Sequence, residues 1–194
     1  MAVGYWETLC VMAGDGNAIA ATTTRTSMTA GSTGGRGVIQ PTQLRVRDML
    51  YIFAAGRISC VATTPGTARF DLAFGTSVGT ANFDSLAINL NTTAKTNVAW
   101  KLEVWGTVKV SGTAANILWQ GTWFSEALIA SPLPTAGGSG EVMVPYNTAP
   151  VVGPNFDSTV IQPIDLNFTQ TVATAGSSVQ LHQFLVALQT SSGF

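Results

Sequence analysis

NVAWKLEVWGTVKVSGTAANILWQGTWF, residues 97–124, is the stretch that decides the fold of this chain. Apolar and polar side chains alternate through its first half. A β-strand has a side-chain period of two residues, so it places one set on each face. We expect one face to carry Trp100, Leu102, Val104, Val108 and Val110, and the other Lys101, Glu103, Thr107 and Lys109.

A second strand follows this one. Ser111, Gly112 and Thr113 are turn-forming residues, and residues 115–124 return to strand-like composition. The pattern predicts a hairpin. One apolar face and one polar face are typical of an antiparallel sheet that covers a core on one side.

The rest of the chain from residue 44 onward indicates further short strands and no helical period. Together with the hairpin they predict an all-β fold, an antiparallel β-sandwich of jelly-roll type, over residues 44–194. The strands are expected within residues 44–62, 69–75, 83–90, 97–110, 115–124, 141–144, 163–173 and 178–189.

Residues 1–43 differ in composition from this domain. They are rich in Gly and Thr and alternate little, so we expect an extended N-terminal arm with loops. The Gly-rich segment 31–37 lacks the ending of a phosphate-binding loop and indicates a connector. Tyr5 and Trp6 lie near the tip of the arm and must be buried somewhere. The chain's own sheet and a neighbouring subunit are both open as partners.

Charge is scarce in this chain. Charged residues are 10% of the sequence, against about 25% in an average globular protein, and the net charge is −1. The nine Lys and Arg form no cluster, which disfavours nucleic-acid binding. No secretory signal and no membrane-spanning stretch are expected. A neutral and partly apolar surface favours a subunit that buries part of its outside against neighbours.

Catalytic and metal-binding patterns are missing from the sequence. His182 is the one histidine, and it lies within a predicted strand. Cys10 and Cys60 are the two cysteines, and without a secretory signal we expect both to be thiols. The sequence predicts a protein that is not an enzyme and that uses no cofactor or metal ion.

Trp105 stands out because it shares a face with Lys101 and Glu103 rather than with Trp100. It could be covered by its own chain, for example by a loop at residues 131–140, or by another subunit, or it could stack on a sugar ring. The last strand is apolar on both faces, which fits a central position or an assembly contact. The candidate interface residues are Tyr5, Trp6, Trp105, Phe184 and Val186.

Three parts of the sequence carry a family resemblance. They are residues 88–100 (INLNTTAKTNVAW), residues 119–129 (WQGTWFSEALI), and the C-terminal segments 155–159, 168–172 and 179–184. Over roughly Gly56 to Leu188 the chain resembles virion structural proteins of tailed bacteriophages, of the jelly-roll capsid cement, decoration or head-fibre type. The resemblance covers structural residues and implies no active site.

The resemblance implies a non-enzymatic cement or decoration protein made in the host cytoplasm and located on the capsid surface of the virion. Its expected partners are the major capsid protein and copies of itself, most simply as a homotrimer, with no nucleic acid and no membrane. A tail or baseplate component is the alternative within the virion. A carbohydrate-binding β-sandwich module is the alternative from another class.

Overall fold

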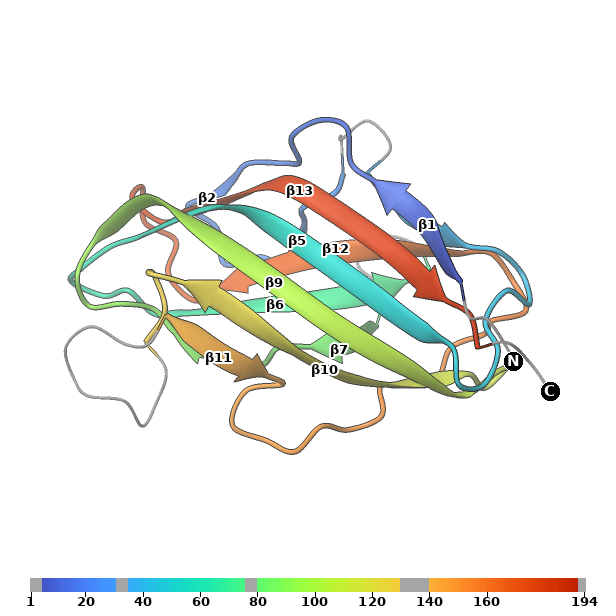
Figure 1. Cartoon of the computed structure of the whole chain (residues 1–194). Coiled ribbons are helices and arrows are strands. Elements are labelled where there is room, and N and C mark those ends of the chain that lie inside the picture. The colour runs from blue at the N-terminus through green and yellow to red at the C-terminus, as the bar shows by residue number, and fades with distance from the viewer. Residues whose placement is uncertain (1–4, 31–34, 76–79, 130–139, 192–194) are drawn as a thin grey trace.

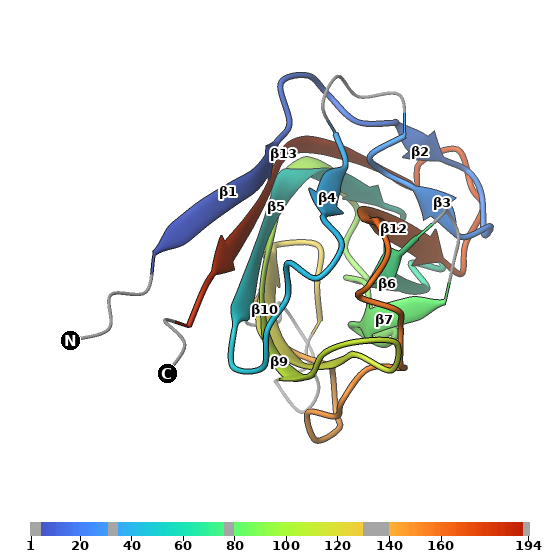
Figure 2. The same cartoon turned by 90° about the vertical axis from the view of Figure 1, so that its right-hand side faces the viewer.

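The described part of the chain is built from β-strands. The computed structural model describes residues 5–30, 35–75, 80–129 and 140–191, and every strand pair in it is antiparallel. Two sheets face each other, as Figures 1 and 2 show, which confirms the expected all-β antiparallel sandwich. These residues hold no helix that is long and apolar enough to cross a membrane.

The larger sheet, sheet A, has the strand order β1-β13-β5-β9-β10-β11, with β2 also pairing with β13. Its strands are β1 (Trp6–Val11), β2 (Ile19–Ala20), β5 (Met49–Cys60), β9 (Lys95–Val110), β10 (Asn116–Ser125), β11 (Glu141–Val144) and β13 (Ser178–Gln189).

The smaller sheet, sheet B, has the order β3-β12-β6-β7. Strand β4 also pairs with β12, and β8 also pairs with β6. Its strands are β3 (Thr26–Ser27), β4 (Gly37–Ile39), β6 (Thr67–Phe74), β7 (Ala81–Asp84), β8 (Ile88–Asn89) and β12 (Gln162–Gln170).

The hairpin that the sequence predicts is strands β9 and β10. Gly112 has a φ of 101° in the connecting turn, a conformation that Gly adopts without a steric penalty. Four of the five expected inward side chains are buried, Trp100, Leu102, Val104 and Val108. The fifth, Val110, was wrongly expected to be in the core. It is 43% exposed because β9 ends there, at the edge of the sandwich.

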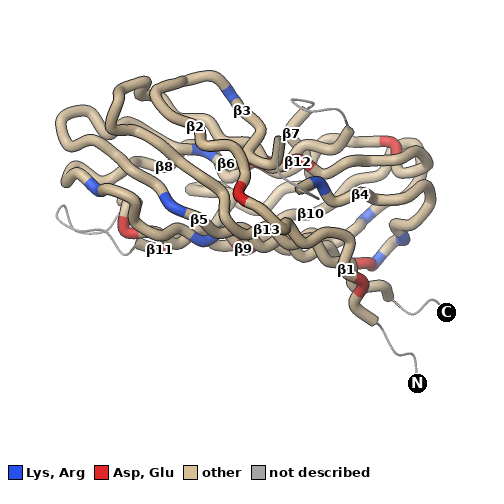
Figure 3. Tube along the Cα trace, turned by 90° about the horizontal axis from the view of Figure 1, so that it is seen from above, with Lys and Arg blue, Asp and Glu red and all other residues tan. Residues whose placement is uncertain are grey.

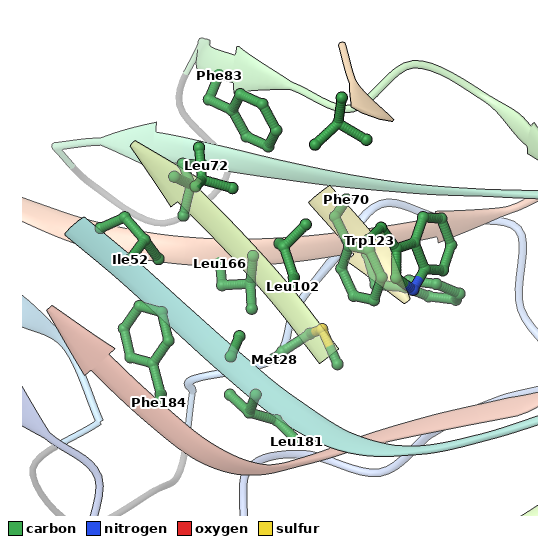
Figure 4. Close-up of a cluster of buried hydrophobic side chains, with 14 of the residues drawn as sticks. Met28, Ile52, Phe70, Leu72, Phe83, Leu102, Trp123, Leu166, Leu181 and Phe184 are labelled. Atoms are coloured by element: carbon green, nitrogen blue, oxygen red, sulfur yellow. The ribbon is translucent and has the colours of Figure 1, made fainter. Parts of the chain in front are cut away.

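Aromatic rings from both sheets meet in the core. Phe70 of sheet B lies with its ring centroid 4.6 Å from that of Trp100 and 4.6 Å from that of Trp123, both on sheet A. Figure 4 shows Phe70 and Trp123 side by side among the other buried side chains. The Trp100 indole donates to the carbonyl oxygens of Arg57 and Gln180, and the Trp119 indole donates to Asn82 Oδ1 at 2.8 Å. Buried indole N–H groups are thereby satisfied at both of these rings.

Wherever it is described, the segment 1–43 takes one of the two placements that the sequence left open for the arm, docking on the sheets of its own chain. Strands β1 and β2 pair with β13 of sheet A, and β3 and β4 pair with β12 of sheet B. Met28 and Ile39 are fully buried in the common core. The segment therefore extends both sheets of its own chain. Its strands are two to six residues long, too short to produce a clear alternation in the sequence. Part of the 31–37 connector lies outside the described residues.

Buried charges hold this segment on the outer side of sheet B. Arg25 makes a two-point contact with the carboxylate of Asp71, with 2.8 Å between Nε and Oδ2. This hydrogen bonding raises the pKa of Arg25. Asp165 is fully buried and accepts a hydrogen bond from Ser27 at 2.7 Å, and Arg36 lies 3.4 Å from its second oxygen. Burying a carboxylate costs free energy unless it is paired and hydrogen-bonded, and these contacts offset part of that cost.

Gly106 gives a test of the core packing. It lies opposite Trp119, and a Cβ atom there would collide with the indole ring and come within 2.7 Å of Ile117 Cγ2. Gly106→Ala should lower the free energy of unfolding by about 1–3 kcal/mol, the usual cost of overpacking. Urea denaturation followed by tryptophan fluorescence measures this. Gly14→Ala is the control, because a Cβ at Gly14 has no atom within 4 Å. Equal unfolding midpoints for the two variants would contradict the packing described.

Met28 tests whether the first 43 residues belong to the core. Its side chain has no exposed surface, so Met28→Ala should cost about 2–5 kcal/mol of unfolding free energy. Val11→Ala lies in the same segment but is 61% exposed, and it should cost little. The same denaturation experiment compares them. A Met28→Ala protein as stable as Val11→Ala would mean that the segment does not pack on its own chain.

Candidate functional site

The face of sheet A that points away from sheet B is unusually apolar for a solvent-exposed surface. Strand register places Ala187, Tyr51, Trp105 and Gln120 in one row across this face, and Leu185, Phe53, Glu103 and Thr122 in the next. We call it the outer face of sheet A. Its exposed large apolar side chains are Trp6, Val11, Trp105, Phe124 and Met143. They come from four strands of one sheet, β1, β9, β10 and β11, so they form a broad surface rather than scattered single residues.

Three aromatic rings gather on this face, which we call the aromatic cluster: Trp6 of β1, Tyr51 of β5 and Trp105 of β9. The ring centroids of Tyr51 and Trp105 are 4.4 Å apart, and the planes are inclined by 39°. Trp6 stands edge-on to both, at 6.3 Å from Tyr51 and 5.8 Å from Trp105. Trp6 is 49% exposed and Trp105 is 39% exposed. The three rings cover one another in part and leave the remainder to solvent.

Two charged residues beside the aromatic cluster pair with each other. Lys101 Nζ lies 3.2 Å from Glu103 Oε1, and both residues share the outward side of β9 with Trp105. Burial raises the pKa of Tyr51, and the nearby Glu103 carboxylate raises it further, so its phenol stays protonated at neutral pH. The aromatic cluster therefore offers apolar contact and a phenolic hydroxyl, without a net charge beside it. Figure 3 shows how few charged residues the described chain carries as a whole.

Two of the five expected interface residues are in fact core residues. Phe184 is 2% exposed and Val186 is fully buried, so the expectation of an interface role is corrected for both. A register shift between Leu181 and Gln183 changes which positions of β13 point inward. Before the shift Leu181 faces the core, and after it Phe184 and Val186 do. Such a bulge breaks the two-residue period, so the sequence pattern does not show which side chains of β13 point into the core.

The other three expected residues are exposed and lie near one another in the fold. Tyr5 is 60% exposed and precedes Trp6 of the aromatic cluster in the sequence. Its backbone carbonyl oxygen accepts a hydrogen bond from the Thr190 N–H at 3.1 Å. Tyr51 was missed, because it and its neighbours in β5 are all apolar or aromatic and show no alternation of polarity. The loop expected to cover Trp105 lies outside the described residues, except for Gly140.

Polar chemistry elsewhere is sparse among the described residues. His182 Nδ1 lies 2.7 Å from Asp15 Oδ1 at the surface. Burial raises the pKa of both cysteine thiols, which makes thiolate chemistry at Cys10 and Cys60 unfavourable at neutral pH. Across the described ranges, no three His, Cys, Asp or Glu side chains come together in a way that could hold a metal ion. The prediction that the chain is not an enzyme stays a prediction.

Comparison with known proteins leaves the family open. No family model matches the chain, and no curated protein matches it. One solved structure with a similar arrangement is the "CBM2 module of Lactobacillus casei BL23 phage J-1 evolved Dit". It has a TM-score of 0.40 and 11% sequence identity, and the match covers 98% of this chain and 99% of that one.

Proposed function

We propose that the chain is a non-enzymatic structural subunit of a tailed-bacteriophage particle and that it attaches to its neighbours through the outer face of sheet A. The observation that carries this proposal is the aromatic cluster, which leaves two Trp side chains partly exposed on a face whose central charges pair with each other. The sequence resemblance to phage virion proteins supports the particle as its setting.

The physical case rests on what an exposed indole gains in a contact. Apolar area removed from water contributes roughly 25 cal/mol per Å², and Trp and Tyr are enriched among the residues that dominate interfaces. The outer face of sheet A adds Phe124 and Met143 at 46% and 55% exposure. A single such contact is modest. In a symmetric shell the same contact repeats many times and the sum becomes large.

Within the particle, we propose the outer surface of the capsid, with the major capsid protein as partner and a homotrimer as the simplest assembly. A tail or baseplate position is the alternative. Electron microscopy of particles that carry a tagged copy of this chain distinguishes the two. Label over the shell supports the cement or decoration role, and label confined to the tail overturns it.

Trp105→Ala tests the attachment surface. Trp105 is outside the common core, so the variant should lose much less than the roughly 3–5 kcal/mol typical of a buried Trp truncation. Its association should weaken by about 2 kcal/mol or more if the cluster is a contact. Light scattering gives the oligomeric state, and cosedimentation with particles gives attachment.

Ile161→Ala is the matched control, since Ile161 is 57% exposed and lies outside sheet A. It should leave both measurements unchanged. A wild-type protein that stays monomeric at tens of micromolar and does not cosediment with particles would overturn the proposal. Equal losses in the two variants would also overturn it.

A second candidate function is carbohydrate binding at the same cluster, favoured by the exposure of Trp6 and Trp105, since sugar rings stack on aromatic faces. The edge-on packing of Trp6 at 70° to Trp105 leaves less free ring face than a flat platform would. Affinity electrophoresis through gels that contain polysaccharide tests it. Retention that Trp105→Ala abolishes, with assembly unchanged, would favour this candidate.

A further inference from the structure

A cavity of about 430 Å³ lies at the far edge of sheet B, away from the aromatic cluster. It is bounded by β7, the edge strand of that sheet, and by the connection that follows β11, which runs along the lower side of the molecule in Figure 1. Its principal lining residues are Arg69, Asp84, Leu86, Pro145, Thr148 and Val151. The volume falls within the roughly 300–1,000 Å³ of known small-molecule sites.

Hydrogen bonds at both ends of the connection after β11 join it to the β7 region that bounds the cavity. At one end the Tyr146 N–H donates to the Ser85 carbonyl oxygen at 2.9 Å. At the other, Asn82 Nδ2 donates to the Pro154 carbonyl oxygen at 2.7 Å, while its Oδ1 accepts from the buried Trp119 indole. Asn82 thus ties β7, the connection and sheet A together. The walls are fixed by the fold, so a ligand would meet a preformed site.

The polar wall of the cavity is an ion pair with spare hydrogen-bonding capacity. Arg69 contacts both oxygens of Asp84, and its Nε lies 2.6 Å from Oδ1. The guanidinium has five N–H donors, of which two are used in this contact, and Asp84 Oδ2 keeps one lone pair beyond its contact with Arg69. The pair is neutral as a unit. It places donors and acceptors side by side at the mouth, where Arg69 is 44% exposed and Asp84 is 27% exposed.

The lining also contains apolar side chains. Leu86 and Val151 are 36% and 59% exposed, and Pro145 lies beside them in the lining. Leu86 has a φ of 62°, a conformation that costs energy for a branched residue, and its N–H donates to Asp84 Oδ1 at 2.9 Å. The Asp84 carboxylate therefore orients both the Arg69 guanidinium and the backbone of Leu86.

We infer that this cavity binds one sugar residue, a neutral ring with hydroxyl groups around its edge. A sugar ring has C–H faces that suit Leu86 and Val151, and adjacent hydroxyls that both donate to Asp84 and accept from Arg69. A charged ligand gains less here, because the ion pair presents no net charge. The inference does not depend on the proposed assembly role, since cavity and aromatic cluster lie on different sheets.

The test is a titration of ¹⁵N-labelled full chain with glucose, galactose, N-acetylglucosamine and rhamnose, followed by two-dimensional NMR. At least one of these sugars should shift the amide signals of Leu86, Thr148 and Val151. Val151→Trp fills the cavity from an exposed position, and Arg69→Leu removes the donors. Each should weaken binding at least tenfold while leaving the rest of the spectrum folded.

Trp105→Ala is the control that separates the two surfaces, and it should bind the sugar as the wild type does. No shifts with any of the four sugars would overturn the inference. So would shifts that centre on Trp105 and vanish in Trp105→Ala, or shifts that persist unchanged in Val151→Trp. Tighter binding of glucuronate or glucosamine than of the neutral sugars would overturn the assignment of a neutral ligand. Failure of particle attachment leaves these outcomes unchanged.

Discussion

Packing of tryptophan rings from sheet A against Phe70 of sheet B is the interaction on which the rest of this structure depends. Trp100 and Trp123 both approach Phe70, and Trp119 fits between the sheets because Gly106 opposite it has no side chain. Few polar groups enter this layer, and the indoles of Trp100 and Trp119 find acceptors at its margins. The sheets are thereby fixed at the separation that large rings require.

This inner layer determines which side chains lie on the outer face of sheet A and which segments close the cavity at sheet B. Because Trp100, Leu102 and Val104 point inward along β9, Trp105 must point outward, where Tyr51 and Trp6 lie against it. On sheet B, the Trp119 indole holds Asn82, and Asn82 in turn holds the connection that closes the cavity. One surface is apolar and open, and the other is a small site with a neutral ion pair. We propose different partners for them, a protein face and a sugar ring.

The sequence predicts the parts of the fold that have a regular period. The β9–β10 hairpin and the later strands follow from alternation, and the outward position of Trp105 follows with them. The inward turn of Phe184 and Val186 could not be predicted, because a bulge in β13 shifts the phase at a strand that is apolar on both faces. The strands of residues 6–39 are too short to show a period. The cavity depends on hydrogen bonds between segments some 70 residues apart, such as Asn82 to Pro154, which leave no local signal.

The position of β13 has a consequence for how the chain folds. In sheet A, β13 lies between β5 and the N-terminal strand β1. In sheet B, β12 lies between β6 and the N-terminal strands β3 and β4. The described strands of residues 6–39 therefore pair with strands in residues 162–189, which are synthesised more than a hundred residues later. Long sequence separation between partners slows folding. Until residues 162–189 have been synthesised, the strands β1 to β4 lack their sheet partners, and in that stage they are open to misassociation.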